Sequence, residues 1–463
     1  MKSQSNSGTS AAARLDRLPI LPFHRRMLGL VGGGLFIDNF DIFIAGAILV
    51  VLLNSGWSTL ELNATFISAT FAGMLIGTIG GGMIADRFGR KFTFQLNLAI
   101  FGLASLACAA APDPHLLIVA RFICGIGLGT EIVVGYSTLA EFVPHRSRGR
   151  WLALLSMTSS FGLLAATILS FLLIPLFGWR VMFVLPGVAA LIILWMRKSI
   201  PESPRWLELK GRHAEADVIV SAVEAEARAR GLTLVEPEIE PIRVAQPLFQ
   251  RKYIRPLVLG SIMQVVLFTA LYGLVSWLPT FLTKQGMSIN QSLGQSALMT
   301  LGGPAGAFFA QFLADRLGRR RAIIGGSILA AVMALIFGQV TSQIGAAVVG
   351  FATFCTVYFL IATVQAIYLP EIFPTEIRIR CNAVCVGIAR ISSIGVPFAV
   401  VYLFDRGGVT TVVTAIAILF VVQALVMTWL GAETAMKSLD SGSEEPPESR
   451  DVSQAAMSTR HTS

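Results

Sequence analysis

Long apolar segments alternate with short polar or Gly/Pro-rich breaks along almost the whole chain. A membrane-spanning helix needs about 20 mostly apolar residues, and each of these segments supplies roughly that number. Six spans, a polar interval and six further spans predict an all-α polytopic membrane protein with twelve transmembrane helices. The predicted spans are 27–52, 63–85, 92–111, 115–137, 150–174, 180–198, 256–282, 294–314, 322–340, 345–369, 381–403 and 409–431.

Polar sequence is confined to the two ends and the middle of the chain. Residues 1–22 do not resemble a signal peptide, so the first span is expected to be retained. Glu, Ala and Arg alternate over 214–230, which predicts one or two surface helices, and the last thirty or so residues have the composition of a disordered segment. The expected organisation is a tail at 1–25, a six-helix half at 26–198, a central segment at 199–255, a second half at 256–432 and a tail at 433–463.

Composition and charge agree with membrane insertion. Hydrophobic residues make up 54% of the chain and charged residues 14%, against about 25% charged in soluble domains. The net charge of +9 does not indicate nucleic-acid binding, because the basic residues are scattered between apolar segments. With residue 1 inside, 31 of the 36 Lys and Arg residues fall on inside segments. Both termini and the central segment are therefore expected to be cytoplasmic, as in a bacterial inner-membrane protein.

The two halves carry matching loop motifs. The run ADRFGRK at 85–91 recurs at 314–320 as ADRLGRR. The run AEFVP at 140–144 recurs at 370–374 as PEIFP, and the offset between its two copies is almost the same as for the first motif. Two motifs repeating at nearly one offset predict two pseudo-symmetric halves, which is the architecture of transporters that bind substrate between parallel repeats.

These motifs resemble those of the major facilitator superfamily. Gly82-x3-Asp86-Arg87-x-Gly89-Arg90-Lys91 is similar to its loop motif between helices 2 and 3, and the second copy has Gln311 in place of the first Gly. Arg121-x3-Gly125-x-Gly127-x-Gly129 is similar to its second motif, and the run PESPRWL at 201–207 resembles the sugar-porter branch and its organic-ion relatives. The resemblance implies the major facilitator fold and transport by alternating access.

The charged residues of the repeated loops are candidate gating residues. Asp86 can pair with nearby Arg side chains, and such networks can latch the two halves together in one state and break in the other. The alternative is that these charges only set the membrane topology. The candidates are Asp86, Arg87, Arg90, Glu141 and Arg148 in the first half, and Asp315, Arg316, Arg319, Glu371 and Arg378 in the second.

Five ionisable residues stand out well inside the apolar runs, where each costs several kcal/mol unless it has a partner or a use. They are Asp38, Asp41, Arg121, Glu131 and Arg390. Asp38 and Asp41 lie three residues apart and share one helix face. The rise along a helix puts Arg121 level with Asp41, which allows a bridge between them, and puts Arg390 near the midplane at the depth of Asp38. Structural bridges between helices are the alternative to a functional role.

The run FIDNFDIF at 36–43 resembles the helix 1 motif of aromatic-acid:proton and metabolite:proton symporters, with Asn39 where those families usually have Gly. An Asp beside a second carboxylate in low dielectric is a candidate proton carrier, and Arg390 can pair with a substrate carboxylate. Proton-coupling residues are therefore expected at Asp38 and Asp41. The candidate substrate-binding residues are Arg390, Arg121, Asn39, Gln264 and Tyr358.

The expected function is uptake of a small organic acid, aromatic acids included, by proton symport. A sugar or polyol symporter, an exporter of a metabolite or drug, and a non-transporting membrane sensor are the alternatives; a single Gln264 in span 7 disfavours a sugar porter. The sequence has no nucleophile–base pair, metal-ligand cluster or phosphate loop, so no enzyme, cofactor or metal is expected. The expected partners are a small-molecule substrate, protons and the lipid bilayer, with the protein as a monomer.

Overall fold

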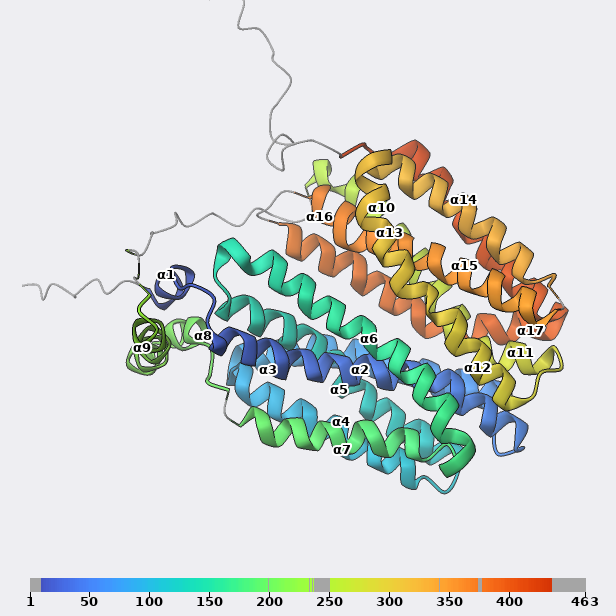
Figure 1. The fold of residues 1–463 in the computed structure, drawn as a ribbon, viewed down its shortest axis with the longest axis horizontal. Coiled ribbons are helices and arrows are strands. Elements are labelled where there is room, and N and C mark those ends of the chain that lie inside the picture. The colour runs from blue at the N-terminus through green and yellow to red at the C-terminus, as the bar shows by residue number, and fades with distance from the viewer. Residues whose placement is uncertain are drawn as a thin grey trace, which may run out of the picture.

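The computed structural model places the apolar helices in two bundles (Figure 1). It describes residues 10–198, 200–232, 234, 236, 250–340, 342–373 and 377–434, and within these ranges every regular element is a helix. The first bundle contains α2 (Pro22–Asn54), α3 (Leu60–Phe88), α4 (Arg90–Ala110), α5 (Pro114–Phe142), α6 (His145–Phe177) and α7 (Val181–Arg197). The second contains α10 (Arg251–Val275), α11 (Leu278–Lys284), α12 (Ile289–Thr300), α13 (Gly302–Leu317), α14 (Arg319–Phe337), α15 (Gln343–Ile361), η1 (Ala362–Tyr368), α16 (Leu369–Glu371) and α17 (Arg378–Leu430).

The helices of the described residues account for the twelve predicted spans. Ten segments are long and apolar enough to cross a membrane. The last of them, in the 53-residue α17, bends at Gly407 and Gly408 and therefore supplies two spans, and the shorter α7 supplies the remaining one. The prediction of an all-α polytopic protein with the major facilitator fold is confirmed.

Three spans of the second bundle are less regular than the sequence pattern predicts. The span at 256–282 is divided into α10 and α11, the span at 294–314 into α12 and α13, and the span at 345–369 passes from α15 into the π-helical turn η1. Proline explains each break, because it has no N–H for the carbonyl four residues earlier. Pro279 lies four residues after the end of α10, Pro304 four residues after the end of α12, and Pro370 just after η1.

Glycines hold α5 against α3 and thereby position the ionisable residues of α5. A methyl group at Gly129 would lie 2.0 Å from the carbonyl oxygen of Met74, and one at Gly125 would lie 2.3 Å from that of Thr70. Gly127 faces Phe101 of α4 in the same way. The glycine motif of this helix therefore serves close packing between helices.

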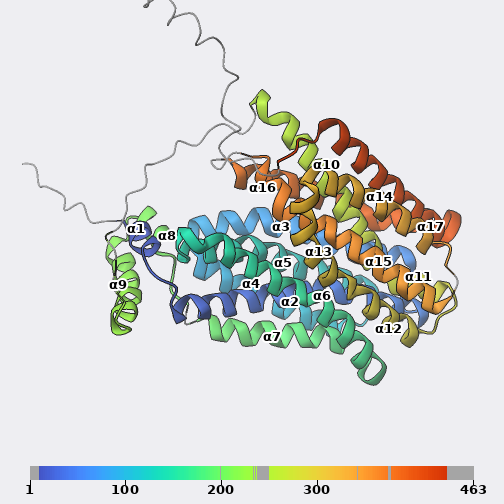
Figure 2. The same cartoon turned by 45° about the horizontal axis from the view of Figure 1, so that its top comes forward.

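Three short helices lie together beyond one end of the first bundle (Figure 1 and Figure 2). They are α1 (Ala11–Asp16), α8 (Pro204–Leu209) and α9 (His213–Ala229). The helix α9 covers the stretch 214–230 in which surface helices were expected, whereas α8 lies before that stretch. We call this the α9 end of the protein, and the opposite end, where α2 finishes beside α11, the α11 end. Residues 237–249 of the central segment and the tail from residue 435 lie outside the described residues.

The two halves contact each other closely at the α11 end. A methyl group at Gly46 of α2 would lie 2.8 Å from the carbonyl oxygen of Ser276, and the hydroxyls of Thr167 in α6 and Thr300 in α12 are 3.0 Å apart. The cavity between the halves here has a volume of about 20 Å³, which holds one water molecule at most. The α11 end is therefore closed.

Candidate functional site

Asp41 and Arg121 form a buried ion pair between α2 and α5. Arg121 Nη1 lies 2.5 Å from Asp41 Oδ2, and both side chains are almost fully inaccessible. The Arg121 guanidinium also donates to the Thr70 hydroxyl at 3.3 Å and lies over the rings of Phe66 and Phe183. The bridge that the helix depths allowed is present, and it balances one carboxylate with one guanidinium.

A second buried ion pair joins α5 to the end of α7. Arg197 Nη2 lies 2.7 Å from Glu131 Oε1, and Asn97 of α4 donates to Glu131 Oε2 at 2.5 Å. Arg197 also donates to the backbone carbonyl of Leu30 at 2.8 Å. Arg197 is one of the 31 Lys and Arg residues counted on inside segments from the sequence, although it lies within the predicted span 180–198. Its position directly after the apolar run of α7 was the signal that it could lie inside the bundle.

Asp38 lies on the same face of α2 as Gly34, one turn further along the helix. A methyl group at Gly34 would lie 2.2 Å from both Arg197 Nη2 and Glu131 Oε1, so this face points at the second pair. Asp38 is buried, and its Oδ2 has no hydrogen-bond partner. Within the described residues it takes part in no ion pair. Asp38 and Asp41 therefore share a helix face, as expected, but differ in their partners.

Arg390 of α17 reaches from the second half to the first. Its Nη1 donates to the hydroxyl of Thr78 in α3 at 3.3 Å, and Tyr272 of α10 lies close enough to act on it electrostatically. In the part of the chain that the structure describes, no carboxylate pairs with Arg390. Tyr272 is ringed by Phe71 at 4.4 Å and Phe268 at 5.7 Å between ring centroids. A half-buried cation thus lies beside an aromatic cluster at the junction of the halves.

The other three candidate substrate-binding residues lie in different surroundings. Asn39 donates its side-chain amide to the Leu35 carbonyl of its own helix, and it packs against Gly162 of α6. Gln264 of α10 is buried and accepts a hydrogen bond from Gln365 of η1 at 3.1 Å. Tyr358 of α15 is near Tyr272, and its ring lies over Gly303. Gln365 was not among the predicted site residues, because the π-helical turn that directs its side chain cannot be recognised from periodicity.

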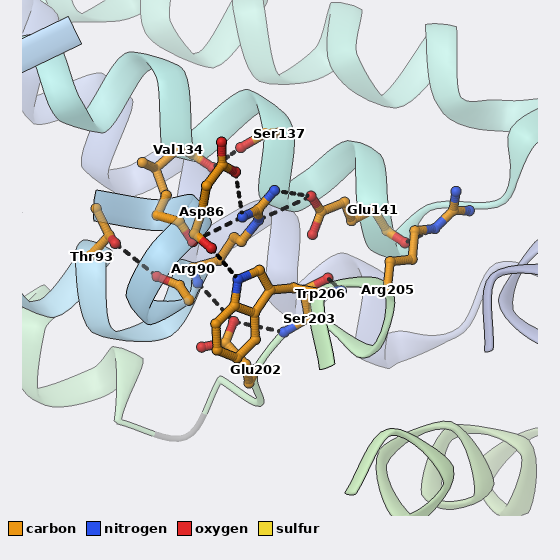
Figure 3. A network of polar contacts seen from close by, with 12 residues as sticks. Asp86, Arg90, Thr93, Val134, Ser137, Glu141, Glu202, Ser203, Arg205 and Trp206 are labelled. Atoms are coloured by element: carbon orange, nitrogen blue, oxygen red, sulfur yellow. Dashed lines mark hydrogen bonds and ion pairs between the residues drawn. The ribbon is translucent and has the colours of Figure 1, made fainter. Parts of the chain in front are cut away.

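The loop motif of the first half forms one polar network at the α9 end (Figure 3). Arg90 lies 3.0 Å from both Asp86 and Glu141, and the indole of Trp206 donates to the Asp86 carbonyl. Glu202 accepts from the backbone N–H of Arg90 at 2.8 Å. It approaches this closely because Gly89, at φ 100°, has no Cβ to collide with it. Arg87 is exposed beside the ring of Phe88.

The second half repeats this network with its own residues. Arg319 lies 3.0 Å from Glu371. Glu433 accepts from the backbone N–H of Arg319 at 2.9 Å, and Gly318, at φ 81°, leaves room for it as Gly89 does for Glu202. The spacing between Glu202 and Glu433 is close to the offset of the loop motifs. This spacing was the sequence signal from which both glutamates could have been identified.

The remaining gating candidates are dispersed. Arg148 pairs with Asp16 of α1 at 3.2 Å, Arg378 donates to the Phe373 carbonyl, and Arg316 is exposed. The side chain of Asp315 lies outside the described residues. Each loop pair named above joins residues of one half, so in this conformation these pairs do not latch the halves together.

The polar tail before α2 is docked at the α9 end by charge. Arg14 of α1 and Arg17, the residue that follows α1, both donate to Glu224 of α9, at 2.9 Å and 2.6 Å. The hydrogen bond from Arg14, aided by that from Arg17, lowers the pKa of Glu224 to about 2. Asp16 bridges to Arg205 of α8 at 2.9 Å. The N-terminal tail, which was expected to extend to residue 25, thus includes a helix, and α2 already begins at Pro22.

Two bundles of membrane-spanning helices with repeated loop networks define a transporter of the major facilitator type, and the chain belongs to the sugar (and other) transporter family, whose model matches residues 28–445. It is therefore a multi-pass membrane transporter and not an enzyme. It is 32% identical over 444 residues to the inner membrane metabolite transport protein YdjE of Escherichia coli, covering 93% of this chain and 98% of the relative.

Two further relatives are named after a substrate. The niacin transporter NiaP of Acinetobacter baylyi is 32% identical over 445 residues, with 93% of this chain and 98% of NiaP covered. The 4-hydroxybenzoate transporter PcaK of the same organism is 30% identical over 315 residues, with 66% and 69% covered. Among solved structures, the partially occluded inward-open xylose transporter XylE of E. coli superposes with a TM-score of 0.71 at 19% identity, covering 90% of this chain and all of XylE.

Proposed function

We propose that this transporter takes up a small organic acid together with a proton, and that aromatic carboxylic acids are the class it selects. The observation that carries the proposal is Arg390, a half-buried guanidinium at the junction of the halves whose contact in the first half is the neutral Thr78. A substrate carboxylate can replace this weak hydrogen bond with a charge-assisted pair. Because Arg390 and Thr78 belong to different halves, a substrate bound between them contacts both halves, and its binding is therefore coupled to their relative movement.

Charge balance supports coupling to a proton. The described spans of the first half contain three buried carboxyl groups, at Asp38, Asp41 and Glu131, and two buried guanidiniums, at Arg121 and Arg197. One carboxyl group is therefore in excess, while Arg390 of the second half is a cation in excess. An anionic substrate and one proton, bound together, neutralise both. Of the two expected proton-coupling residues, Asp38 and Asp41, the excess carboxyl group is Asp38, because Asp41 pairs with Arg121.

The aromatic cluster supports the choice of substrate class. Tyr272 lies near the guanidinium of Arg390, and the rings of Phe71 and Phe268 pack against Tyr272. A flat ring bearing a carboxylate matches both features, since aromatic pairs add about 0.5–1.5 kcal/mol beyond burial. Niacin, 4-hydroxybenzoate and gallate, after which three relatives are named, are all aromatic carboxylic acids.

Orientation and gating complete the proposal. We propose that the α9 end is cytoplasmic, because the loops there carry most of the basic residues. The closed α11 end then faces outward, so the structure represents an inward-facing state. Outward opening would bring the Arg90–Glu141 and Arg319–Glu371 networks of the two halves together at the α9 end, where they act as gating residues.

Transport by the purified protein in proteoliposomes tests this function. We expect an inward proton gradient to drive accumulation of nicotinate, 4-hydroxybenzoate or gallate, and to have no effect on nicotinamide or xylose. Replacing Arg390→Gln removes a charge-assisted contact of about 1.5–3 kcal/mol, which corresponds to about 10- to 100-fold weaker competition by carboxylates. Arg406→Gln, an exposed arginine in the same helix, is the matched control. Equal losses for acids and their amides would contradict the role of Arg390.

A sugar or polyol symporter is the second candidate. It is favoured by the hydrogen-bonded amides of Gln264 and Gln365, which could together bind a neutral hydroxyl-rich substrate. Xylose uptake in the same vesicles without uptake of any acid would favour this second function.

A further inference from the structure

The Glu131–Arg197 pair and Asp38 together make a site with unequal charges. Glu131 comes from α5, Arg197 from α7 and Asp38 from α2, and the charged groups near enough to act on Asp38 are Glu131, Arg197 and Asp41. Asp41 is already neutralised by Arg121. Two carboxyl groups therefore compete for the single guanidinium of Arg197. An ionised carboxylate without a cation costs several kcal/mol in such surroundings, and a bound proton removes that cost.

Residues of the same site also carry hydrogen-bonding atoms that have no partner. Arg197 Nη1, Asp38 Oδ2 and Asn97 Oδ1 are buried and have no hydrogen-bond partner. Buried polar groups that serve only as a structural bridge are almost always fully paired. The Asp41 carboxylate also has one unpaired oxygen, but it lacks the second carboxyl group and the spare guanidinium nitrogen. The incomplete pairing of the Arg197 site is therefore accompanied by an excess of negative charge.

Gly34 provides the space in which these groups meet. Its missing side chain leaves room for Arg197 Nη2 and Glu131 Oε1 against the backbone of α2. Residues four apart on a helix are about 5–6 Å apart at Cβ, so Asp38 lies one turn from the pair on the side of the membrane centre. Arg197 closes the site on the other side by donating to the carbonyls of Leu30 and Val31. The site thus extends from the middle of α2 toward the α9 end.

We propose that Asp38 and Glu131 share one proton beside Arg197, so that this site, and not the Asp41–Arg121 pair, binds the coupling proton. The assignment rests on the proposed proton symport and deepens it. In one arrangement Asp38 carries the proton and Glu131 pairs with Arg197. In the other, the O–H bond at Asp38 has broken, an O–H bond has formed at Glu131, and Arg197 pairs with Asp38. The net charge of the site is zero in both, and Asn97 is a positioning residue that holds Glu131.

Infrared difference spectroscopy on the protein in proteoliposomes tests the site without a substrate. A protonated carboxyl group has a C=O stretch that vanishes when it ionises, and spectra recorded between acid and alkaline pH report it. We expect one such band in the wild type and in Asp41→Asn, and its loss in Asp38→Asn. Glu131→Gln leaves one carboxylate, Asp38, facing one guanidinium, Arg197. Asp38 should then be ionised, so the band should also be absent from spectra recorded near neutral pH. A band that persists in Asp38→Asn, or disappears in Asp41→Asn alone, would overturn the assignment.

Transport separates this inference from the proposed function. In Glu131→Gln we expect exchange of external for internal 4-hydroxybenzoate to continue while accumulation driven by a proton gradient is lost at least tenfold. Glu61→Gln, which removes an exposed carboxylate at the start of α3, is the matched control and should retain both accumulation and the infrared band. If wild-type vesicles transport none of the aromatic acids, the substrate proposal fails while the infrared result still decides where the proton binds. Normal accumulation in Glu131→Gln would overturn the role of Glu131.

Discussion

Gly34 is the position at which the smallest substitution should have a large effect. In Gly34→Ala the added methyl carbon would lie 2.2 Å from Arg197 Nη2 and from Glu131 Oε1, and 3.1 Å from the carbon of the guanidinium. Both side chains are buried and held by other contacts, so they cannot move aside at low cost. Disrupting a buried ion pair costs about 3–5 kcal/mol. Alanine regains about 1 kcal/mol over glycine in a helix, which leaves a net loss of about 2–4 kcal/mol.

Gly29 of the same helix provides the control. A methyl group there meets nothing within 4 Å, so Gly29→Ala should stabilise the protein by up to about 1 kcal/mol through helix propensity alone. Reversible unfolding by a denaturing detergent in mixed micelles, followed by circular dichroism, measures both free energies. If the two variants differ by less than about 0.5 kcal/mol, the Glu131–Arg197 pair does not occupy the space beside Gly34 and the reasoning fails.

Three further predictions concern other parts of the molecule. Arg121→Gln leaves the buried carboxylate of Asp41 without a cation and should cost about 3–5 kcal/mol in the same unfolding assay; adding Asp41→Asn should recover most of it. Gly46→Val should disfavour the closed α11 end by about 1–3 kcal/mol, seen as a longer distance between spin labels on α2 and α11, whereas Gly80→Val, in open space, should not. Because its folded pKa is lowered to about 2, Glu224 stabilises the docking of α1 above its ordinary pKa of 4.5 and loses this contribution as the pH falls toward 2. Hydrogen exchange of α1 should therefore rise only below about pH 4 and should be fast at neutral pH in Glu224→Gln.

The helical pattern was predictable because apolar length is a local property. A segment of about twenty apolar residues crosses the bilayer whatever its neighbours are, so the spans of the first half match α2 to α7 to within a few residues. The breaks after α10 and α12 were missed for a related reason. Pro279 and Pro304 lie within apolar runs, and hydropathy does not register a missing N–H.

The ionisable residues inside the spans were recognisable one by one, but their pairing was not. Helix depth alone placed Arg121 level with Asp41, and the structure joins them. The same depth argument gave no partner to Glu131, because Arg197 stands at the end of its helix, where sequence patterns place solvated charges. Which residues of α5 and α7 face the same point depends on how each helix is rotated about its axis.

The class of this protein, its two-half repeat and the short set of charged residues inside the spans could all be predicted from the amino-acid sequence. Each of these follows from hydropathy, from motif spacing or from the cost of burying charge. The folded arrangement was needed to show that Asp41 is neutralised while Asp38 is not, that Arg197 belongs to the interior, and that Arg390 contacts a hydroxyl of the opposite half. These outcomes depend on helix rotation and on glycine contacts such as Gly34, which bring distant residues within hydrogen-bonding distance.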